Sequence, residues 1–370
     1  MSGTAWYTVA DAGEIASPAL LVYADRVREN IRRMVALAGG PERLRPHMKT
    51  NKLPEVVRMH LDEGITRFKC ATIAEAEMVA ACGGEDVLLG YQPVGPNVNR
   101  FVELVRGFPS ARFSAVVDDE GAIRALSATA ARAGVTLDLL LDLDCGMHRT
   151  GVPPGDGALR LYRAIHTSAS LAPAGLHAYD GHIRDRDAAE RTAACEAAFV
   201  PVRQLERRLY AEGLPVPARV FGGTPTFPIH ARHPDVQCSP GTTVFWDLGS
   251  MTGFPDLDFL PAVLLLTRVV SRPGADLLCL DLGHKAIASE MLPPRVQLFG
   301  LPDAQQVVHS EEHLVVRTAR ASEVAVGDAF YAVPWHVCPT VALHQEAVAI
   351  RDGRAVDRWR VVARSRALSI

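Results

Sequence analysis

Short apolar runs alternate with longer helical runs through the first two thirds of this 370-residue chain. The helical runs carry apolar residues at spacings of three and four, the pattern of a helix with one buried face. Strands that alternate with helices form a parallel sheet. This many units favour closure of the sheet, so we predict an α/β fold with a (β/α)8 TIM-type barrel. The strand-like runs are 20–23, 44–48, 67–70, 87–90, 111–117, 137–143, 175–179, 219–221 and 236–239.

The pattern changes near residue 260, beyond which strand-like runs follow one another without long helices. A barrel takes about 250 residues, so the remaining length fits a smaller second domain. Within 348–356, Asp352-Gly353 is typical of a two-residue hairpin turn. We predict a barrel domain over 15–255 and a β-rich C-terminal domain over 256–370. As a hypothesis, residues 1–14 pack on the second domain.

Charge and cysteine usage exclude several classes of function. The formal net charge is −3 and no basic run occurs, which argues against a nucleic-acid partner. The most apolar stretch, 259–270, is too short to span a bilayer and contains Pro261 and Arg268. Seven cysteines without a CxxC pair indicate reduced thiols rather than a disulfide framework. We expect a cytoplasmic protein without a membrane partner.

Four polar motifs each follow a strand-like run: Lys49, Arg149, the segment 179–182 and the segment 222–224. A single lysine is most often a solvated surface residue, so one motif alone would carry little weight. In barrels, however, the catalytic groups come from the C-terminal ends of the strands and from the loops that follow them. The shared position therefore predicts that the four motifs form one site.

The first of these motifs, Lys49, supplies an amine that can form an imine with an aldehyde. Gly222, Gly223 and Thr224 form a glycine–hydroxyl turn of the kind that wraps a phosphate with backbone amides. An imine-forming lysine and a phosphate cradle on one β/α framework suggest pyridoxal 5'-phosphate as the cofactor. Arg149 would hold a negative oxygen on the cofactor ring.

Two further pairs of residues carry candidate chemistry. Tyr179 could stack on the cofactor ring, and His182 could act as a general base because imidazole titrates near neutral pH. His336 and Cys338 are two apart on a run that reads as extended, so both would face one side. Imidazole and thiolate together suit zinc, and two protein ligands leave room for water or substrate. A core cysteine beside a hydrogen-bonded histidine is the alternative.

Together these motifs resemble the D-threonine aldolase and D-serine dehydratase family, which shares its barrel with alanine racemase (the fold type III pyridoxal-phosphate enzymes). Singly each motif is modest, but they run in family order over nearly the whole chain. The matching pieces are 45–50, 146–151, 179–182, 222–224, 281–285, 311–313 and 336–340.

The resemblance implies that Lys49 carries the cofactor and that Arg149 contacts its phenolic oxygen. It implies that Gly223 and Thr224 hold the phosphate, and that the protein is a homodimer acting on a small amino-acid substrate. It further implies a divalent metal held by the His-x-Cys motif, which would grip the substrate's β-hydroxyl. A thiolate favours zinc, whereas manganese or magnesium would prefer oxygen ligands.

The reaction type stays open between two branches of the family. The His336-x-Cys338 pair resembles the zinc-binding dehydratase pattern, while the well-known aldolases present His-x-Asp. The rest of the chain, including 179–182, resembles the aldolases. We therefore predict retro-aldol cleavage of β-hydroxy-D-amino acids to glycine and an aldehyde, with D-serine dehydration to pyruvate and ammonia as the alternative.

Two other functions are less well supported. A racemase would take its second base from a tyrosine of the C-terminal domain, and Tyr331 is the only tyrosine beyond Tyr210. A non-catalytic pyridoxal-phosphate carrier on the same barrel would consist of the barrel alone, and the predicted β-rich domain argues against it.

Overall fold

The computed structural model describes residues 5–370, which divide into two compact units built from separated stretches of the chain. The barrel unit comprises Ile31–Lys49, Val56–Gly241 and Ser365–Ile370. The β-rich unit comprises the chain up to Asn30, Thr50–Glu55 and Thr242–Arg364. The linear domain bounds predicted from the sequence, 15–255 and 256–370, stay a prediction.

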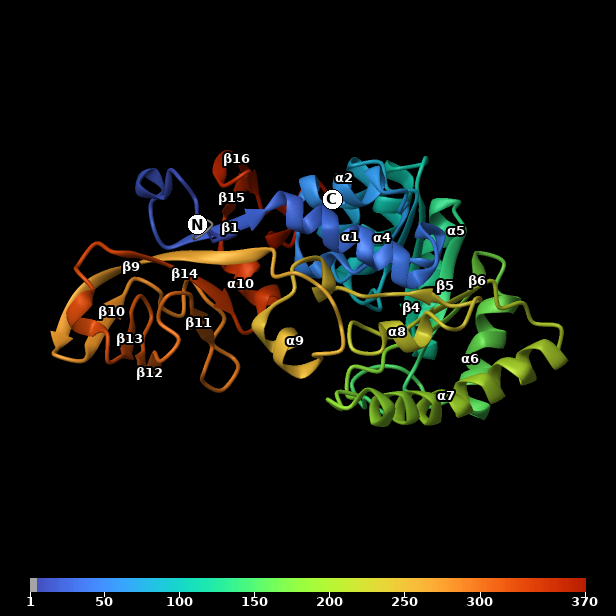
Figure 1. The fold of residues 1–370 in the computed structure, drawn as a ribbon. Coiled ribbons are helices and arrows are strands. Elements are labelled where there is room, and N and C mark those ends of the chain that lie inside the picture. Colours follow the sequence, from blue (N-terminus) through green and yellow to red (C-terminus); the bar gives the residue numbers. More distant parts are fainter. Residues whose placement is uncertain (1–4) are drawn as a thin grey trace. The chain divides into compact units, whose positions relative to one another are not determined.

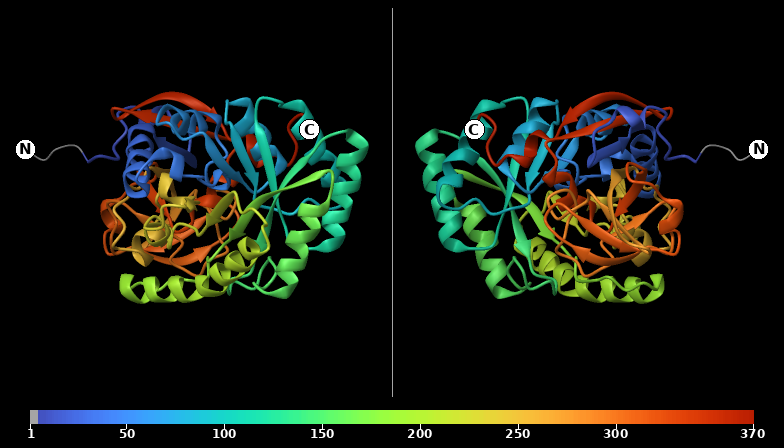
Figure 2. Two further views of the ribbon diagram at one scale, coloured as in Figure 1. Left: turned by 90° about the vertical axis from the view of Figure 1, so that its right-hand side faces the viewer. Right: turned by 90° about the vertical axis from the view of Figure 1, so that its left-hand side faces the viewer.

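In the barrel unit, the strands are all parallel and lie side by side in chain order. Helices cover the outside of these strands (Figure 1, Figure 2). This arrangement confirms the predicted alanine racemase-like α/β fold. The strands are β2 (Arg67–Cys70), β3 (Asp86–Leu89), β4 (Arg112–Val117), β5 (Leu137–Leu143), β6 (Leu171–Ala178), β7 (Ala218–Phe221) and β8 (Gln237–Cys238). The helices are α1 (Ala24–Ala38, shared with the β-rich unit), α2 (Pro54–Asp62), α3 (Ile73–Ala81), α4 (Pro96–Gly107), α5 (Glu120–Ala133), α6 (Asp156–Thr167), α7 (Ala188–Ala211) and α8 (Phe227–His230).

The segment 44–47 connects the two edges of this sheet. Leu44 forms a parallel bridge to Cys238 of β8, and His47 forms a parallel bridge to Lys69 of β2. The segment therefore takes the place of a further barrel strand, as the sequence predicted for 44–48. Pro46 has no N–H to donate to a ladder, which explains why only isolated bridges form here.

Side chains fill the barrel interior in layers. An apolar layer is formed by one residue from each of five consecutive strands, Leu88, Val116, Leu140, Ala174 and Val220. Nearer the C-terminal strand ends, the interior becomes polar. Such a packed core with polar groups at the C-terminal end is the usual organisation of barrel enzymes.

The expectation that residues 20–23 form a barrel strand is wrong. β1 (Ala19–Tyr23) instead pairs antiparallel with β9 (Val263–Gly274) and parallel with β15 (Glu346–Arg351) in the β-rich unit. All residues of β1 are buried. A continuous apolar run indicates a strand covered on both faces, but it does not reveal which sheet the strand joins.

The β-rich unit is a mainly antiparallel sheet, as the change of pattern near residue 260 predicted. Asp352 and Gly353 have φ angles of 49° and 69°, which confirms the two-residue hairpin turn. The Tyr7 ring stacks on Phe299 with centroids 4.5 Å apart; Met1–Thr4 lie outside the described residues. The remaining elements are β10 (Leu277–Leu280), β11 (Val296–Leu298), β12 (Gln305–His309), β13 (Leu314–Arg317), β14 (Ala329–Pro334), β16 (Arg354–Arg360), α9 (Leu248–Gly253) and α10 (Val337–Leu343).

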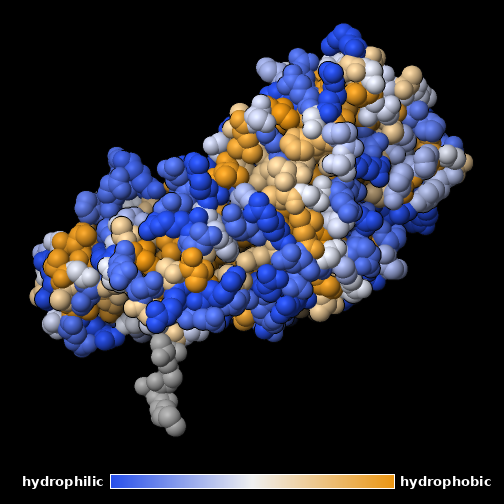
Figure 3. Space-filling model, turned by 90° about the horizontal axis from the view of Figure 1, so that it is seen from above, coloured by the Kyte–Doolittle hydropathy of each residue, from blue (hydrophilic) through white to orange (hydrophobic). Residues whose placement is uncertain are grey.

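In the part of the chain that the structure describes, we find no helix with the length and apolar character needed to cross a membrane. On the face drawn in Figure 3, apolar side chains lie scattered among polar ones. Scattered exposed apolar residues are normal on folded proteins.

Candidate active site

Lys49 lies in a single 3-10 turn, η3 (Met48–Thr50), directly after the segment that bridges β8 and β2. It lines a cavity of about 530 Å³ together with Asp142 and Arg149. Small-molecule sites typically occupy about 300–1,000 Å³. The structure therefore gives the predicted imine-forming lysine a cavity of suitable size.

The Tyr179 ring, which follows β6, connects the other predicted residues. The Lys49 Nζ lies 5.8 Å from the ring centroid, and the Arg149 guanidinium carbon lies 4.7 Å from it. A Cβ at Gly223 would lie only 2.8 Å from Tyr179 Cε2. The structure thus places Lys49, Arg149 and the glycine turn around the Tyr179 ring. The close approach of the backbone to this ring requires a glycine at 223.

The amides of the glycine turn are partly engaged within the protein. Gly222 has a φ of +76°, and its N–H donates to the Ala178 carbonyl oxygen at 3.0 Å. Its contribution is therefore conformational rather than that of a free phosphate donor, which corrects the sequence expectation for this amide. The Gly223 N–H makes a longer contact, 3.3 Å, with Thr226 Oγ1. Thr224 lies at the same turn and is buried.

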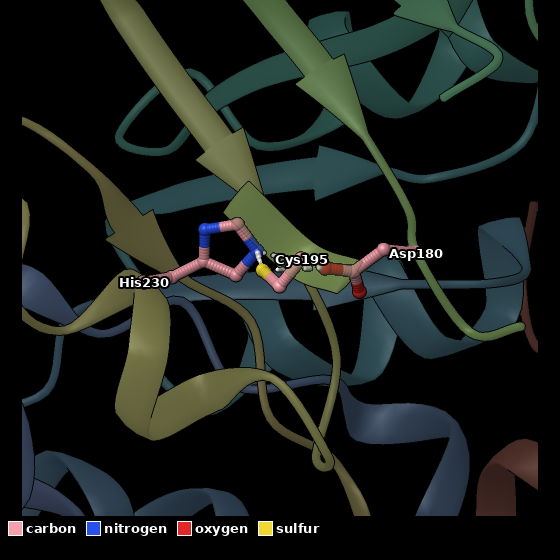
Figure 4. A group of neighbouring side chains, drawn as sticks. All are labelled: Asp180, Cys195 and His230. Carbon is pink, nitrogen blue, oxygen red and sulfur yellow. Dashed lines mark hydrogen bonds and ion pairs between the residues drawn. The ribbon is translucent and has the colours of Figure 1, made fainter. Parts of the chain in front are cut away.

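A buried group of three side chains, Asp180, Cys195 and His230, supports this turn (Figure 4). Asp180 accepts hydrogen bonds from Thr226 Oγ1 at 2.7 Å and from His230 Nε2 at 2.8 Å. The Cys195 Sγ lies 3.7 Å from Asp180 Oδ2 and 3.5 Å from His230 Nε2. These donor atoms could hold a metal ion, since thiolate, imidazole and carboxylate are all zinc ligands. Without an ion, the same contacts brace the loop after β7 against the loop after β6.

Asp142 and His177, at the ends of β5 and β6, form a second buried pair at 2.6 Å. Burial raises the pKa of Asp142, but His177 and Thr150 stabilise its anion more, so that its pKa lies below its ordinary value. Burial and the nearby charge of Lys69 both lower the pKa of His177. The pair therefore carries negative charge on the cavity side of the barrel.

Lys69, the third residue of β2, is a site residue that the sequence did not predict. Its side chain is buried, and its Nζ lies 5.7 Å from the Tyr179 ring centroid. Burial, and then the charge of Lys49, lower the pKa of Lys69 to about 7. The available signal was a lysine between Phe68 and Cys70 in a strand-like run.

His182 is exposed and lies against the loop that carries Arg149. A Cβ at Gly146, whose φ is +120°, would lie 2.9 Å from His182 Nε2. The predicted general base is thus close to the same loop as Arg149, and glycine at 146 leaves it room.

His336 and Cys338 are not on an extended run, and that part of the prediction is wrong. His336 caps the N-terminus of α10, and Cys338 lies in the first turn of this helix. The two side chains still meet: burial lowers the pKa of His336, but Cys338 and Glu290 outweigh it and raise this pKa to about 9. Glu290 Oε1 lies 2.5 Å from His336 Nδ1, which leaves Nε2 as the nitrogen for a metal.

Comparison with known proteins identifies the class. Residues 22–248 match the family model "Alanine racemase, N-terminal domain", and residues 262–350 match a model described as a serine dehydratase domain. The chain belongs to the alanine racemase N-terminal domain family, whose members depend on pyridoxal phosphate, and it is a lyase of that family.

Within this family, the chain is similar to aldolases and dehydratases of hydroxy-amino acids. It is 29% identical to the D-threonine aldolase of Arthrobacter sp., over 94% of this chain and 92% of the relative. It is also 29% identical to the D-threo-3-hydroxyaspartate dehydratase of Delftia sp. (strain HT23), over 93% and 96%. The crystal structure of D-threonine aldolase from Filomicrobium marinum matches with a TM-score of 0.89 and 29% identity, over 97% of this chain and 98% of that one.

Proposed function

We propose that the chain cleaves the Cα–Cβ bond of β-hydroxy-D-amino acids, giving glycine and an aldehyde. The observation that carries this proposal is the gathering of Lys49, Arg149 and Gly223 around the Tyr179 ring beside a cavity of about 530 Å³. The similarity to D-threonine aldolases over nearly the whole chain supports the aldolase branch.

The cofactor, when bound, supplies an aldehyde for Lys49 and a ring that accepts the electron pair left at Cα. Lys49 would hold it covalently, and Arg149 would neutralise a negative oxygen on its ring. Tyr179 would pack against the ring, while Gly223 and Thr224 would receive the phosphate. These side chains come from four different strand ends, so the barrel fixes their relative positions.

We assign the proton transfer from the substrate's hydroxyl to His182, which is exposed. His182 takes the proton from the substrate's β-hydroxyl as the Cα–Cβ bond breaks, and the oxygen becomes the carbonyl of the released aldehyde. The electron pair that remains on Cα later takes up a proton, which gives glycine. An imidazole suits this task because it can accept and release a proton near neutral pH.

His336 and Cys338 are proposed as the ligands of a divalent metal. Sulfur and imidazole nitrogen together favour zinc over manganese or magnesium, and the Glu290 contact would orient the histidine. The metal would polarise the substrate's β-hydroxyl, which helps either branch of the reaction. The buried group of Asp180, Cys195 and His230 is the competing metal site.

D-serine dehydration is the second candidate. The thiolate at position 338 in place of a carboxylate and the similarity to a hydroxyaspartate dehydratase favour it. In this reaction the Cα proton would leave first, and a metal held by His336 and Cys338 would assist the departure of hydroxide. Two further features of the prediction are kept as proposals: a homodimer, and a cytoplasmic location, which is supported by seven cysteines that are all free thiols.

Incubation of the metal-loaded enzyme with D-threonine and D-serine tests the proposal. Glycine and acetaldehyde from D-threonine support the aldolase; pyruvate and ammonia from D-serine support the dehydratase. The same incubations with the L-enantiomers serve as the stereochemical control. Cofactor that binds at Lys49 without any turnover would favour a carrier and reject both reactions.

A further inference from the structure

Lys69 points into the barrel rather than toward the covering helices. Its register partner on β3 is Leu88, a member of the interior apolar layer. Its neighbour Phe68 faces the other way, because its ring contacts His60 of α2 with centroids 6.1 Å apart. Since successive side chains of a strand alternate between its faces, the Lys69 side chain lies inside the barrel.

The Lys69 side chain lies against Gly90, a residue that lines the same cavity as Lys49. A Cβ at Gly90, a cavity-lining residue, would lie 2.8 Å from Lys69 Cε, so the glycine makes room for this side chain. Lys69 and Lys49 lie at nearly equal distances from the Tyr179 ring centroid, 5.7 Å and 5.8 Å. Arg149 contacts the same ring.

The nearby carboxylates already accept hydrogen bonds from other groups. Asp142 pairs with His177 at 2.6 Å, and Asp180 pairs with His230 at 2.8 Å. Among residues 5–370, no carboxylate forms an ion pair with Lys69 within 4.0 Å, although its side chain is only 4% exposed. A buried ammonium without a partner is destabilising, and it becomes favourable when an anion is placed beside it.

We propose that Lys69 is an anion-binding residue of the cofactor cavity, which receives a deprotonated oxygen of a bound molecule. Two sources have this chemistry: the ring oxygen of the cofactor and the carboxylate of the substrate. Both would lie close to Lys49, because the ring oxygen is borne by the carbon next to the aldehyde-bearing carbon, and the substrate's carboxylate is on its Cα. This inference rests on the proposed function.

Charge balance supports an anion at this position. Lys49, Lys69 and Arg149 surround the Tyr179 ring, and the electrostatic partners that oppose Lys69 are Asp142 and Asp180. Burial and Lys49 lower the pKa of Lys69 to about 7 in the protein alone. An anion beside the amine would raise this pKa again, so that binding above pH 7 requires the uptake of a proton.

The test compares Lys69→Met, Lys69→Arg and a control, Arg124→Met, which removes a positive charge from the exposed Arg124–Glu120 pair on α5. Cofactor affinity is measured by absorbance titration of the cofactor-free protein, with borohydride trapping and mass spectrometry to confirm attachment at Lys49. KM and kcat are then measured with D-threonine on the cofactor-saturated protein.

If the ring oxygen is the partner, Lys69→Met weakens cofactor affinity at least tenfold and shifts the visible absorption band. If the substrate's carboxylate is the partner, cofactor affinity and the band stay unchanged while KM rises at least tenfold. Lys69→Arg keeps most of the wild-type affinity in either case. A Lys69→Met protein that is folded and within twofold of the control in both quantities would overturn the proposal.

If the Lys69 variants do not fold, the pH dependence of binding by the wild-type protein still tests the proposal. Cofactor affinity or the affinity for D-threonine should fall by up to tenfold per pH unit above pH 7, since the neutral amine must first take up a proton. If neither the cofactor affinity nor the D-threonine affinity falls above pH 7, the proposal is also overturned. A wild-type protein that binds and turns over normally, with no effect at Lys69, would reject this inference alone; failure of the wild type to attach the cofactor would reject the proposed function.

Discussion

Replacing Asp180 should loosen the turn that is proposed to hold the cofactor phosphate. The carboxylate is fully buried and accepts hydrogen bonds from Thr226 Oγ1 and His230 Nε2, at 2.7 Å and 2.8 Å. Thr226 in turn contacts the Gly223 amide. Asp180→Ala therefore removes one partner from a buried pair and leaves the imidazole and the hydroxyl unsatisfied.

The expected loss of stability follows from these contacts. Leaving a buried donor unsatisfied costs about 1–3 kcal/mol, and Asp180→Ala leaves two, so we expect a loss of about 3–5 kcal/mol. At roughly 2.1 cal/mol/K of unfolding entropy per residue, this corresponds to a fall of about 4–6 °C in the thermal midpoint if the whole chain unfolds together. Asp180→Asn retains an acceptor for His230 and should cost less, about 1–2 kcal/mol.

Thermal unfolding followed by circular dichroism measures the midpoint, and absorbance titration measures cofactor affinity for the folded variants. Asp156→Ala, which removes an exposed partner of Arg208, is the control and should leave the midpoint unchanged. We expect both Asp180 variants to bind the cofactor more weakly than this control. An Asp180→Ala protein within 1 °C of wild type, with normal cofactor affinity, would refute the bracing role.

Three further predictions concern the cofactor, the metal and barrel closure. Lys49→Ala should abolish the visible band of the lysine-bound cofactor, and a retained band would reject Lys49 as the attachment point. Cys338→Ser should lose bound metal and at least tenfold of the activity, whereas Cys195→Ser should keep both; metal analysis showing the reverse would place the ion at Asp180, Cys195 and His230. Arg45 holds Asp86 through two contacts of 2.8 Å and 2.9 Å, so Arg45→Met should cost about 3–5 kcal/mol by urea unfolding, and a loss under 1 kcal/mol would contradict it. Burial raises the pKa of Asp86, but Arg45 lowers it more, so the stabilisation is present at neutral pH and is lost below about pH 4; a pH-independent difference between wild type and Asp86→Asn would show that this charge pair contributes nothing.

Much of the barrel could be predicted from the local spacing of apolar residues. The predicted strands at 67–70 and 137–143 match the structure, because apolar spacing along the chain depends on which face of each element is buried. The common position of Lys49 and the other polar motifs also followed, since residues at the C-terminal ends of parallel strands meet at one end of a barrel.

The predictions failed where a non-local contact decided the outcome. The run 20–23 reads as a buried strand in either sheet, and only its pairing with β9 and β15 assigns it to the β-rich unit. The segment around His336 and Cys338 reads as extended from its apolar residues, but α10 begins there, with the Val337 N–H bonded to the distant Asp247 carboxylate at 3.0 Å.

By itself, the sequence determined the α/β class, the change to a β-rich second part and the candidate imine-forming lysine, because these depend on residue type and spacing along the chain. Only the tertiary structure revealed that Lys69 and Lys49 lie near the same Tyr179 ring and that Asp180 joins the loops after β6 and β7. The physical reason is that the charge environment of a buried group is set by neighbours from other strands, which lie far away in the sequence.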